Sequence, residues 1–124
     1  MAGAGVMGMM TTHPALLDRP VDNHTWMFFA PGLASRGDWP DVAAARAPVP
    51  LLVQFNRDDQ LFTPQGMSAA HNRLTTRYRQ AGAPDAYVGE FYEGPHKFDI
   101  AMQQSVLRTW ISGCASDLSP HGRC

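Results

Sequence analysis

Residues 50–59 read Pro50-Leu51-Leu52-Val53-Gln54-Phe55-Asn56-Arg57-Asp58-Asp59, and this stretch decides the expected fold. Its apolar part, Leu51–Phe55, is short, nearly continuous and entered through a proline, which is typical of a strand buried in a parallel sheet. Two carboxylates follow it. Ligands of open α/β sheets bind beyond the carboxyl ends of the strands, so we expect Asp58 and Asp59 to lie at such a position.

Two further apolar runs stand on either side of this stretch. Ala4–Met10 and Tyr87–Tyr92 both predict strands of similar burial. Between Phe55 and the last run, Thr63 is a good N-cap with Pro64 in the first helical position. The residues that recur there at helical spacing, and so predict one helix face ending before Gly82, are Met67, His71, Leu74 and Tyr78.

Another helix is predicted from about Lys97 to Ser112, because apolar residues repeat there every four positions: Phe98, Met102, Val106 and Trp110. Strand–helix alternation predicts an α/β fold of about three parallel strands with flanking helices. The proline-rich segment 11–47 is expected to form an excursion with short helices that covers a pocket. We assign residues 1–114 to a single domain and residues 115–124 to a polar tail.

Composition narrows the class of protein. The chain has 124 residues, 44% of them hydrophobic, and a net charge of −1. This balance of charges argues against a nucleic-acid partner, because proteins that bind nucleic acids usually carry an excess of basic residues. No apolar run approaches the ~18 residues of a membrane span, and the amino terminus lacks the basic start of a secretory signal. We therefore expect a cytoplasmic protein without a membrane partner, with Cys114 and Cys124 as reduced thiols.

The residues after the last predicted strand carry the other candidate group, because His96 lies in Glu93-Gly94-Pro95-His96-Lys97. If the strands 51–55 and 87–92 are neighbours, His96 and a carboxylate face each other. A carboxylate fixes the tautomer of a histidine and stabilises the imidazolium that forms when the ring takes a proton. The alternative is a surface acid cluster beside a helix-capping histidine. Among the other histidines, His71 is expected on a helix flank and His13 in solvent.

The chain resembles the C-terminal half of an α/β-hydrolase, in the branch similar to acetyl-xylan esterases and acyl-peptidases. The motifs that carry the resemblance are Gly37-Asp38-Trp39-Pro40-Asp41, Arg46-Ala47-Pro48-Val49-Pro50, Asp59-Gln60-Leu61-Phe62 and Glu93-Gly94-Pro95-His96-Lys97-Phe98. The resemblance covers most of residues 5–112. It implies that Asp59 is the triad acid and His96 the triad base, with Asp58 as the competing acid.

The chain departs from that family at the nucleophile. The family carries it as Gly-x-Ser-x-Gly upstream of the acid and the histidine, and no such pentapeptide occurs here. Ser35 is the least implausible substitute. The resemblance therefore implies a truncated hydrolase fold that lacks the nucleophile-bearing half. An uncovered edge at Ala4–Met10 would be a template for pairing, so we expect a homo-oligomer, most simply a dimer, that buries this run.

Two functions follow from these expectations. One is hydrolysis of a small ester substrate (a carboxyl ester, a lactone or an activated phosphoester) by water activated at Asp59 and His96. A divalent metal such as Zn²⁺ could replace the missing nucleophile, with ligands from His96, Asp59, His24 and Asp58. The alternative is a non-catalytic or split half that needs a partner chain. No nucleotide is expected, because the glycine pattern at residues 3–8 lacks the strand that a dinucleotide fingerprint follows.

Overall fold

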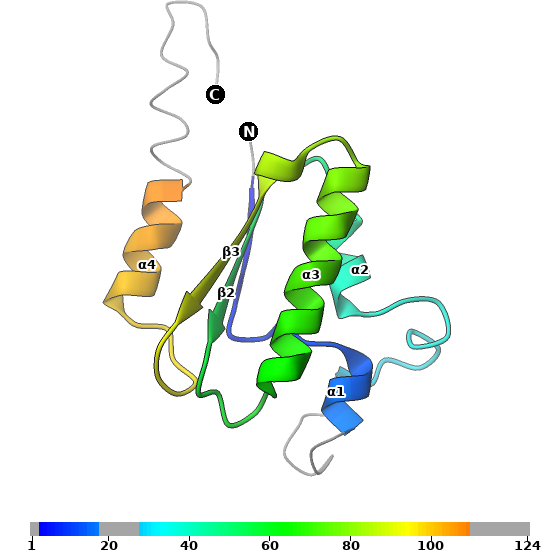
Figure 1. Cartoon of the computed structure of the whole chain (residues 1–124), viewed down its shortest axis with the longest axis horizontal. Helices are drawn as coiled ribbons and strands as arrows, with labels where there is room; N and C mark the ends of the chain where they lie inside the picture. The colour runs from blue at the N-terminus through cyan, green and yellow to red at the C-terminus, as the bar shows by residue number, and fades with distance from the viewer. Residues whose placement is uncertain (1–2, 18–27, 110–124) are drawn as a thin grey trace, which may run out of the picture.

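The computed structural model describes residues 3–17 and 28–109. Three parallel strands form its sheet, in the order β1 (Ala4–Met7), β2 (Leu51–Asn56) and β3 (Tyr87–Tyr92). Helices lie on both sides of this sheet (Figure 1). The predicted α/β class and the predicted parallel sheet are therefore confirmed. Within the described ranges, no helix has the length and apolar character that crossing a membrane requires.

Strand β2 is the centre of the sheet. Leu51 pairs with Ala4 on one side and with Tyr87 on the other, and all six residues of β2 are buried. A strand with neighbours on both edges and helices over both faces has no side exposed to water, which explains why its sequence is nearly continuously apolar. Its last residue, Asn56, opens the loop that carries Asp58 and Asp59.

Helix α3 (Pro64–Gln80) connects β2 to β3 and covers one face of the sheet. As predicted, Thr63 caps it, and its hydroxyl accepts a hydrogen bond from Gly66 N at 3.1 Å. The predicted helix face is also confirmed, because Met67, Leu74 and Tyr78 are buried in the main core. That core lies between α3 and the side chains of one sheet face, which are Leu51, Val53, Phe55 and Tyr87.

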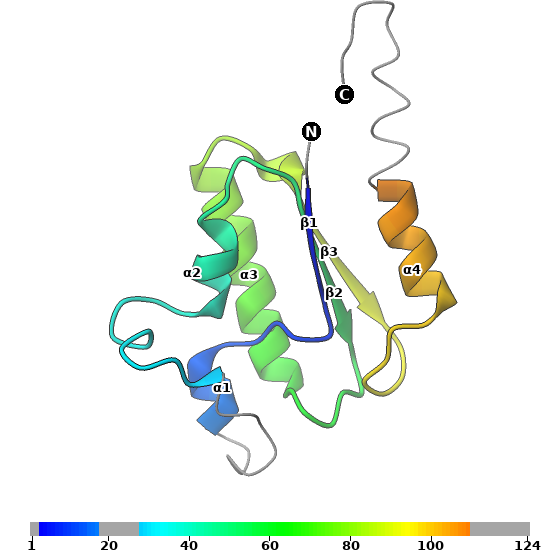
Figure 2. The same ribbon diagram turned by 180° about the vertical axis from the view of Figure 1, so that it is seen from behind.

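The connection from β1 to β2 passes over the same face and contains two short helices, α1 (His13–Leu17) and α2 (Trp39–Ala44) (Figure 2). Short helices were expected in this proline-rich excursion. A capping box starts α2, in which Asp38 and Asp41 each accept a hydrogen bond from the backbone of the other end of the box. Asp38 is also 3.1 Å from His13, whose side chain is only 13% exposed. The expectation that His13 is solvated is therefore wrong.

Helix α4 (Ile100–Leu107) follows β3 and lies on the opposite face of the sheet from α3 (Figure 1). The predicted start near Lys97 is wrong, because the Asp99 side chain accepts a hydrogen bond from Met102 N and caps the helix there. Lys97 pairs with Asp99 at 2.9 Å and belongs to the preceding loop. Met102 is buried as the repeat predicts, whereas Phe98 lies outside the helix and is exposed.

Strand β1 is the edge strand next to β2, and it ends at Met7 rather than at the predicted Met10. Gly8 follows with a φ of 62°, a conformation that favours glycine and turns the chain out of the strand. Trp110, the polar tail at 115–124 and both cysteines lie outside the described residues, as does His24.

Candidate active site

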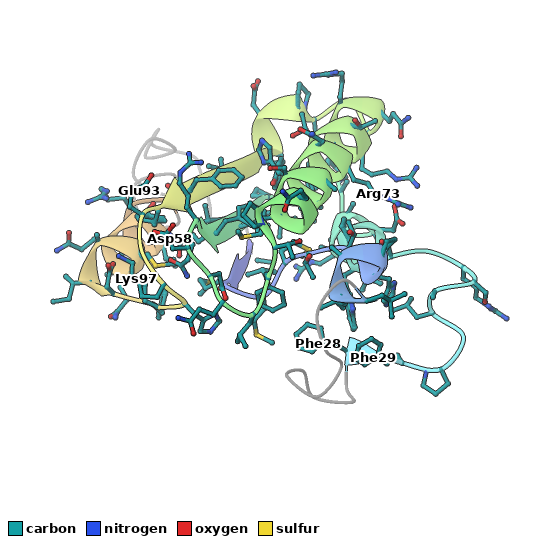
Figure 3. The ribbon with its side chains drawn as sticks, turned by 60° about the horizontal axis from the view of Figure 1, so that its bottom comes forward. Phe28, Phe29, Asp58, Arg73, Glu93 and Lys97 are labelled. Atoms are coloured by element: carbon teal, nitrogen blue, oxygen red, sulfur yellow. The ribbon has the colours of Figure 1, made fainter. Side chains whose placement is uncertain are left out.

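The chemistry-bearing loops meet at the carboxyl ends of the central and last strands. Figure 3 shows Asp58 on the loop after β2 lying beside Glu93 and Lys97, which belong to the loop after β3. The two loops continue the sheet pairing, because Arg57 N donates to Tyr92 O at 2.8 Å and Asp58 N donates to Gly94 O at 3.1 Å. The site prediction depended on β2 and β3 being adjacent strands, and the structure confirms that they are.

Asp59 and His96 form a hydrogen-bonded pair at this edge of the sheet. The distance between Asp59 Oδ2 and His96 Nδ1 is 2.8 Å. The Asp59 side chain is 1% exposed and the His96 side chain 45% exposed. A buried carboxylate therefore holds the inner ring nitrogen, and the imidazole extends into solvent. Because Nδ1 is bonded to Asp59, Nε2 is the ring nitrogen that can exchange a proton with an incoming molecule.

The two neighbouring aspartates have different roles. Asp59 Oδ1 accepts a hydrogen bond from Leu61 N at 2.8 Å, which orients its other oxygen toward His96. Asp58 is exposed, and its Oδ2 accepts a hydrogen bond from Gly94 N at 3.0 Å. Asp59 is therefore hydrogen-bonded to the imidazole, whereas Asp58 is hydrogen-bonded to the backbone of the loop that carries His96.

The His96 ring is bounded by two further residues. The Phe62 ring centroid is 6.4 Å from that of His96. Gly8 approaches closely, because a Cβ built on it would lie 3.1 Å from His96 Cε1. Sequence reasoning did not identify Gly8 as part of the site. In the sequence Gly8 lies inside the apolar run Ala4–Met10 and in the glycine pattern at residues 3–8, and neither tells which distant residue the glycine approaches.

The residues proposed as metal ligands are only partly brought together. Asp59 and His96 are in contact, Asp58 faces Gly94, and His24 lies outside the described residues. Among residues 3–17 and 28–109, no group of three or more His, Cys, Asp or Glu side chains could hold an ion. Both Asp59 oxygens already accept hydrogen bonds, so Nε2 of His96 is the position at which the pair could bind a metal.

Ser35 is placed in a turn before α2. Its hydroxyl donates to Gly32 O at 2.8 Å, and the residue is exposed. This local hydrogen bond accounts for Ser35 as a turn residue.

An apolar groove of about 400 Å³ lies along the edge formed by β1. Its walls come from β1, the segment after it and the excursion: Val6, Met9, Met10, Phe28, Trp39, Val42 and Ala43. The excursion therefore does line a pocket, as expected. The groove borders the strand edge that the sequence predicts to be a pairing surface.

Comparison with known proteins adds no relationship to this geometry. No protein-family model matches the chain, no curated protein matches it significantly, and no solved structure matches it significantly.

Proposed function

We propose that the protein hydrolyses ester-type bonds, with His96 as the general base and Asp59 as the group that orients it. One observation carries this proposal: a buried carboxylate lies 2.8 Å from Nδ1 of an imidazole that is otherwise open to solvent. This combination fixes one tautomer and leaves a basic nitrogen facing the substrate side. The order of acid and histidine after neighbouring parallel strands also supports the resemblance to the second half of an α/β-hydrolase.

The proposed reaction uses water as the nucleophile. Nε2 of His96 takes a proton from a water molecule while the water oxygen forms a bond to the ester carbonyl carbon. The carboxylate of Asp59 stabilises the resulting imidazolium. When the bond between the acyl carbon and the leaving oxygen breaks, the imidazolium returns the proton to that oxygen. Water is a weak nucleophile, so we expect carboxyl esters, lactones or phosphoesters with good leaving groups as substrates.

Hydrolysis by a bound divalent metal ion such as Zn²⁺ is the alternative form of this proposal, because Nε2 of His96 cannot both bind an ion and take a proton from water. A bound ion would lower the pKa of a coordinated water to ~7 and so supply a stronger nucleophile. His96 would contribute Nε2, and Asp59 would hold the other ring nitrogen, as carboxylates do behind metal-binding histidines. Chelation should then abolish hydrolysis and Zn²⁺ should restore it, with elemental analysis showing about one ion per chain.

The test of the dyad is hydrolysis of p-nitrophenyl acetate by the wild type, His96→Gln and Asp59→Asn. We expect kcat/KM to fall by about 10²–10⁴-fold in both variants, the usual range for loss of general-base catalysis. His13→Gln is the matched control, because His13 also contacts an aspartate, Asp38, but belongs to helix α1 and is not part of the Asp59–His96 pair. Equal rates in His96→Gln and His13→Gln would refute the proposal.

A second function is favoured by the edge of β1. Ala4 N donates to Pro50 O and Gly8 N donates to Gln54 O, so in a parallel ladder the peptide groups of Gly5 and Met7 point away from β2. This edge and the adjoining apolar groove suit a partner that supplies a strand. We propose that a second copy of the chain pairs here in a two-fold dimer. In the split-half version, a separate chain that carries the nucleophile occupies the edge instead.

Gly5→Pro tests this pairing, because proline removes the outward N–H without touching the ladder to β2. Gly5→Ala keeps that N–H and is the matched control. Light scattering should show a dimer for the wild type and Gly5→Ala and a folded monomer for Gly5→Pro. A compact wild-type monomer would rule out the dimer. An inactive wild type that gains esterase activity only on mixing with a nucleophile-bearing half would favour the split-half function.

A further inference from the structure

Three hydrogen bonds join residues 56–59, at the end of β2 and the start of the following loop, to the loop that carries His96. Asn56 Nδ2 donates to Lys97 O at 3.0 Å. Gly94 N donates to Asp58 Oδ2, and His96 Nδ1 is bonded to Asp59 Oδ2. The histidine is therefore fixed through its own ring and through backbone groups on both sides of it, and all the partners come from one four-residue segment.

Asn56 differs from Asp58 in its surroundings. Asn56 is the last residue of β2 and is fully buried, whereas Asp58 is exposed. Asn56 Oδ1 has no hydrogen-bond partner among the described residues. Burying an amide with one unpaired oxygen costs stability, so an apolar side chain would suit this strand end better if packing were its only task. The hydrogen bond from Asn56 Nδ2 to Lys97 O explains why an amide side chain occupies this buried position.

Gly8 supplies the other half of this arrangement. Its backbone lies where a Cβ would be 3.1 Å from His96 Cε1 and 3.6 Å from Asn56 Nδ2. The backbone of Gly8, the Asn56 amide and the His96 imidazole are therefore close neighbours. A side chain at position 8 would push on the ring and disfavour the position in which it reaches Asp59.

We propose that Asn56 and Gly8 are positioning residues for His96: Asn56 holds the histidine loop through the Lys97 carbonyl, and Gly8 leaves the space in which the imidazole reaches Asp59. Neither touches the substrate. Their importance for catalysis rests on the proposed function, but their effect on the ring does not. Misplacement of a catalytic group by about 1 Å costs about 10²-fold in rate.

Asn56→Leu tests the first half of the proposal, because leucine keeps the volume and removes the donor. Imidazole ¹⁵N shifts, with His96 assigned from the His96→Gln spectrum, should show a single Nδ1–H tautomer in the wild type and a mixture in Asn56→Leu. We expect kcat to fall by about 10²-fold while KM changes little. Gln54→Leu is the matched control, since Gln54 is a buried amide of the same strand that bonds to Met102 O instead; its His96 tautomer should match the wild type.

Gly8→Ala tests the second half and does not depend on the folding of Asn56→Leu. Gly82→Ala is its control, because Gly82 has a similar φ of 71° but nothing within 4 Å of the position of a Cβ. Both substitutions place a Cβ on a residue with a similar positive φ, so the contacts with His96 and Asn56 are what distinguish Gly8→Ala. We expect tautomer mixing and a lower kcat in Gly8→Ala, and a wild-type imidazole spectrum in Gly82→Ala.

The outcomes separate the two proposals. Tautomer mixing in Asn56→Leu or Gly8→Ala, with controls unchanged, supports the positioning role even if the wild type hydrolyses no ester, in which case only the proposed function fails. A single wild-type tautomer in both variants overturns the positioning role, whatever the rates show.

Discussion

The two faces of the sheet are built by different physical means. Toward α3, the side chains of Val53 and Phe55 pack in an apolar core with Leu74. Toward α4, the intervening residue Gln54 donates hydrogen bonds to Glu90 and to Met102 O. One strand therefore serves both purposes, because successive side chains point to opposite faces.

The difference between the two faces suggests that the apolar face mainly stabilises the fold, whereas the polar face mainly orients α4 against the sheet. Apolar contacts are non-directional, and their worth scales with the area removed from water. Hydrogen bonds require particular distances and angles. Glu90 accepts bonds from Gln54, Tyr92 and Ser105, and this network fixes α4 against the sheet. The loop that carries His96 connects β3 to α4, and its own hydrogen bonds go to the segment from Asn56 to Asp59.

The largest expected effect is a loss of packing on the α3 face. Leu74→Ala should lower the free energy of unfolding by about 2–5 kcal/mol, the usual cost of deleting a buried leucine side chain, because Leu74 is completely buried. Urea denaturation measures this. Leu107→Ala on the other helix should change it by less than about 0.5 kcal/mol, since Leu107 is exposed. Similar losses in both would mean that the two faces do not differ as described.

An intermediate effect is expected from the polar face. Burial raises the pKa of Glu90, but hydrogen bonds from Ser105, Gln54 and Tyr92 outweigh this and leave the pKa below its ordinary value of 4.5. The carboxylate therefore stabilises the fold above pH 4.5, and this contribution is lost as the pH falls through the lowered pKa.

Glu90→Gln should cost about 1–3 kcal/mol at neutral pH, because Gln54 then faces another amide donor. The same change at Glu93, an exposed partner of Arg57, should cost at most about 1 kcal/mol. If chemical denaturation gave equal losses for the two glutamates, the network would not be what fixes α4.

The smallest effect is a pH dependence within the α3 face. His71 Nδ1 lies 2.9 Å from the Tyr87 hydroxyl, and burial lowers the pKa of His71 below 6.5. The neutral ring is therefore favoured in the fold. Stability from this group is complete above pH 6.5 and declines as the pH falls from there through the lowered pKa. His71→Gln should flatten the unfolding free energy between pH 7.5 and 5.5; an unchanged slope would contradict this assignment.

Local patterns predicted the sheet and the main helix well. The apolar run at 51–55 and the spacing from Met67 to Tyr78 are patterns of residues close together in the chain, so a single sequence is enough to predict the strand and the helix. The start of α4 was misplaced because the four-residue repeat continues into Phe98, whereas Asp99 provides the cap. A capping residue sets a helix boundary more sharply than a hydrophobic repeat does.

The site was predicted only as far as strand adjacency allowed. Strand adjacency placed an acid and His96 at one edge, but only the resemblance favoured Asp59 over Asp58, because the choice depends on the direction in which each side chain leaves the loop. Asn56 was missed since its partner, Lys97 O, is distant in the chain and is a backbone atom without a sequence signature. The pairing of His13 with Asp38 was missed for the same reason.

The position of Gly8 has a consequence for regulation. Met7 belongs to the edge strand that we propose as the pairing surface, and a Cβ built on the next residue, Gly8, would lie 3.1 Å from His96 Cε1. Any chain that docks along β1 would stiffen the backbone one peptide away from the proposed base. Under the proposed function and the proposed dimer, the rate of hydrolysis would then rise with protein concentration more steeply than linearly.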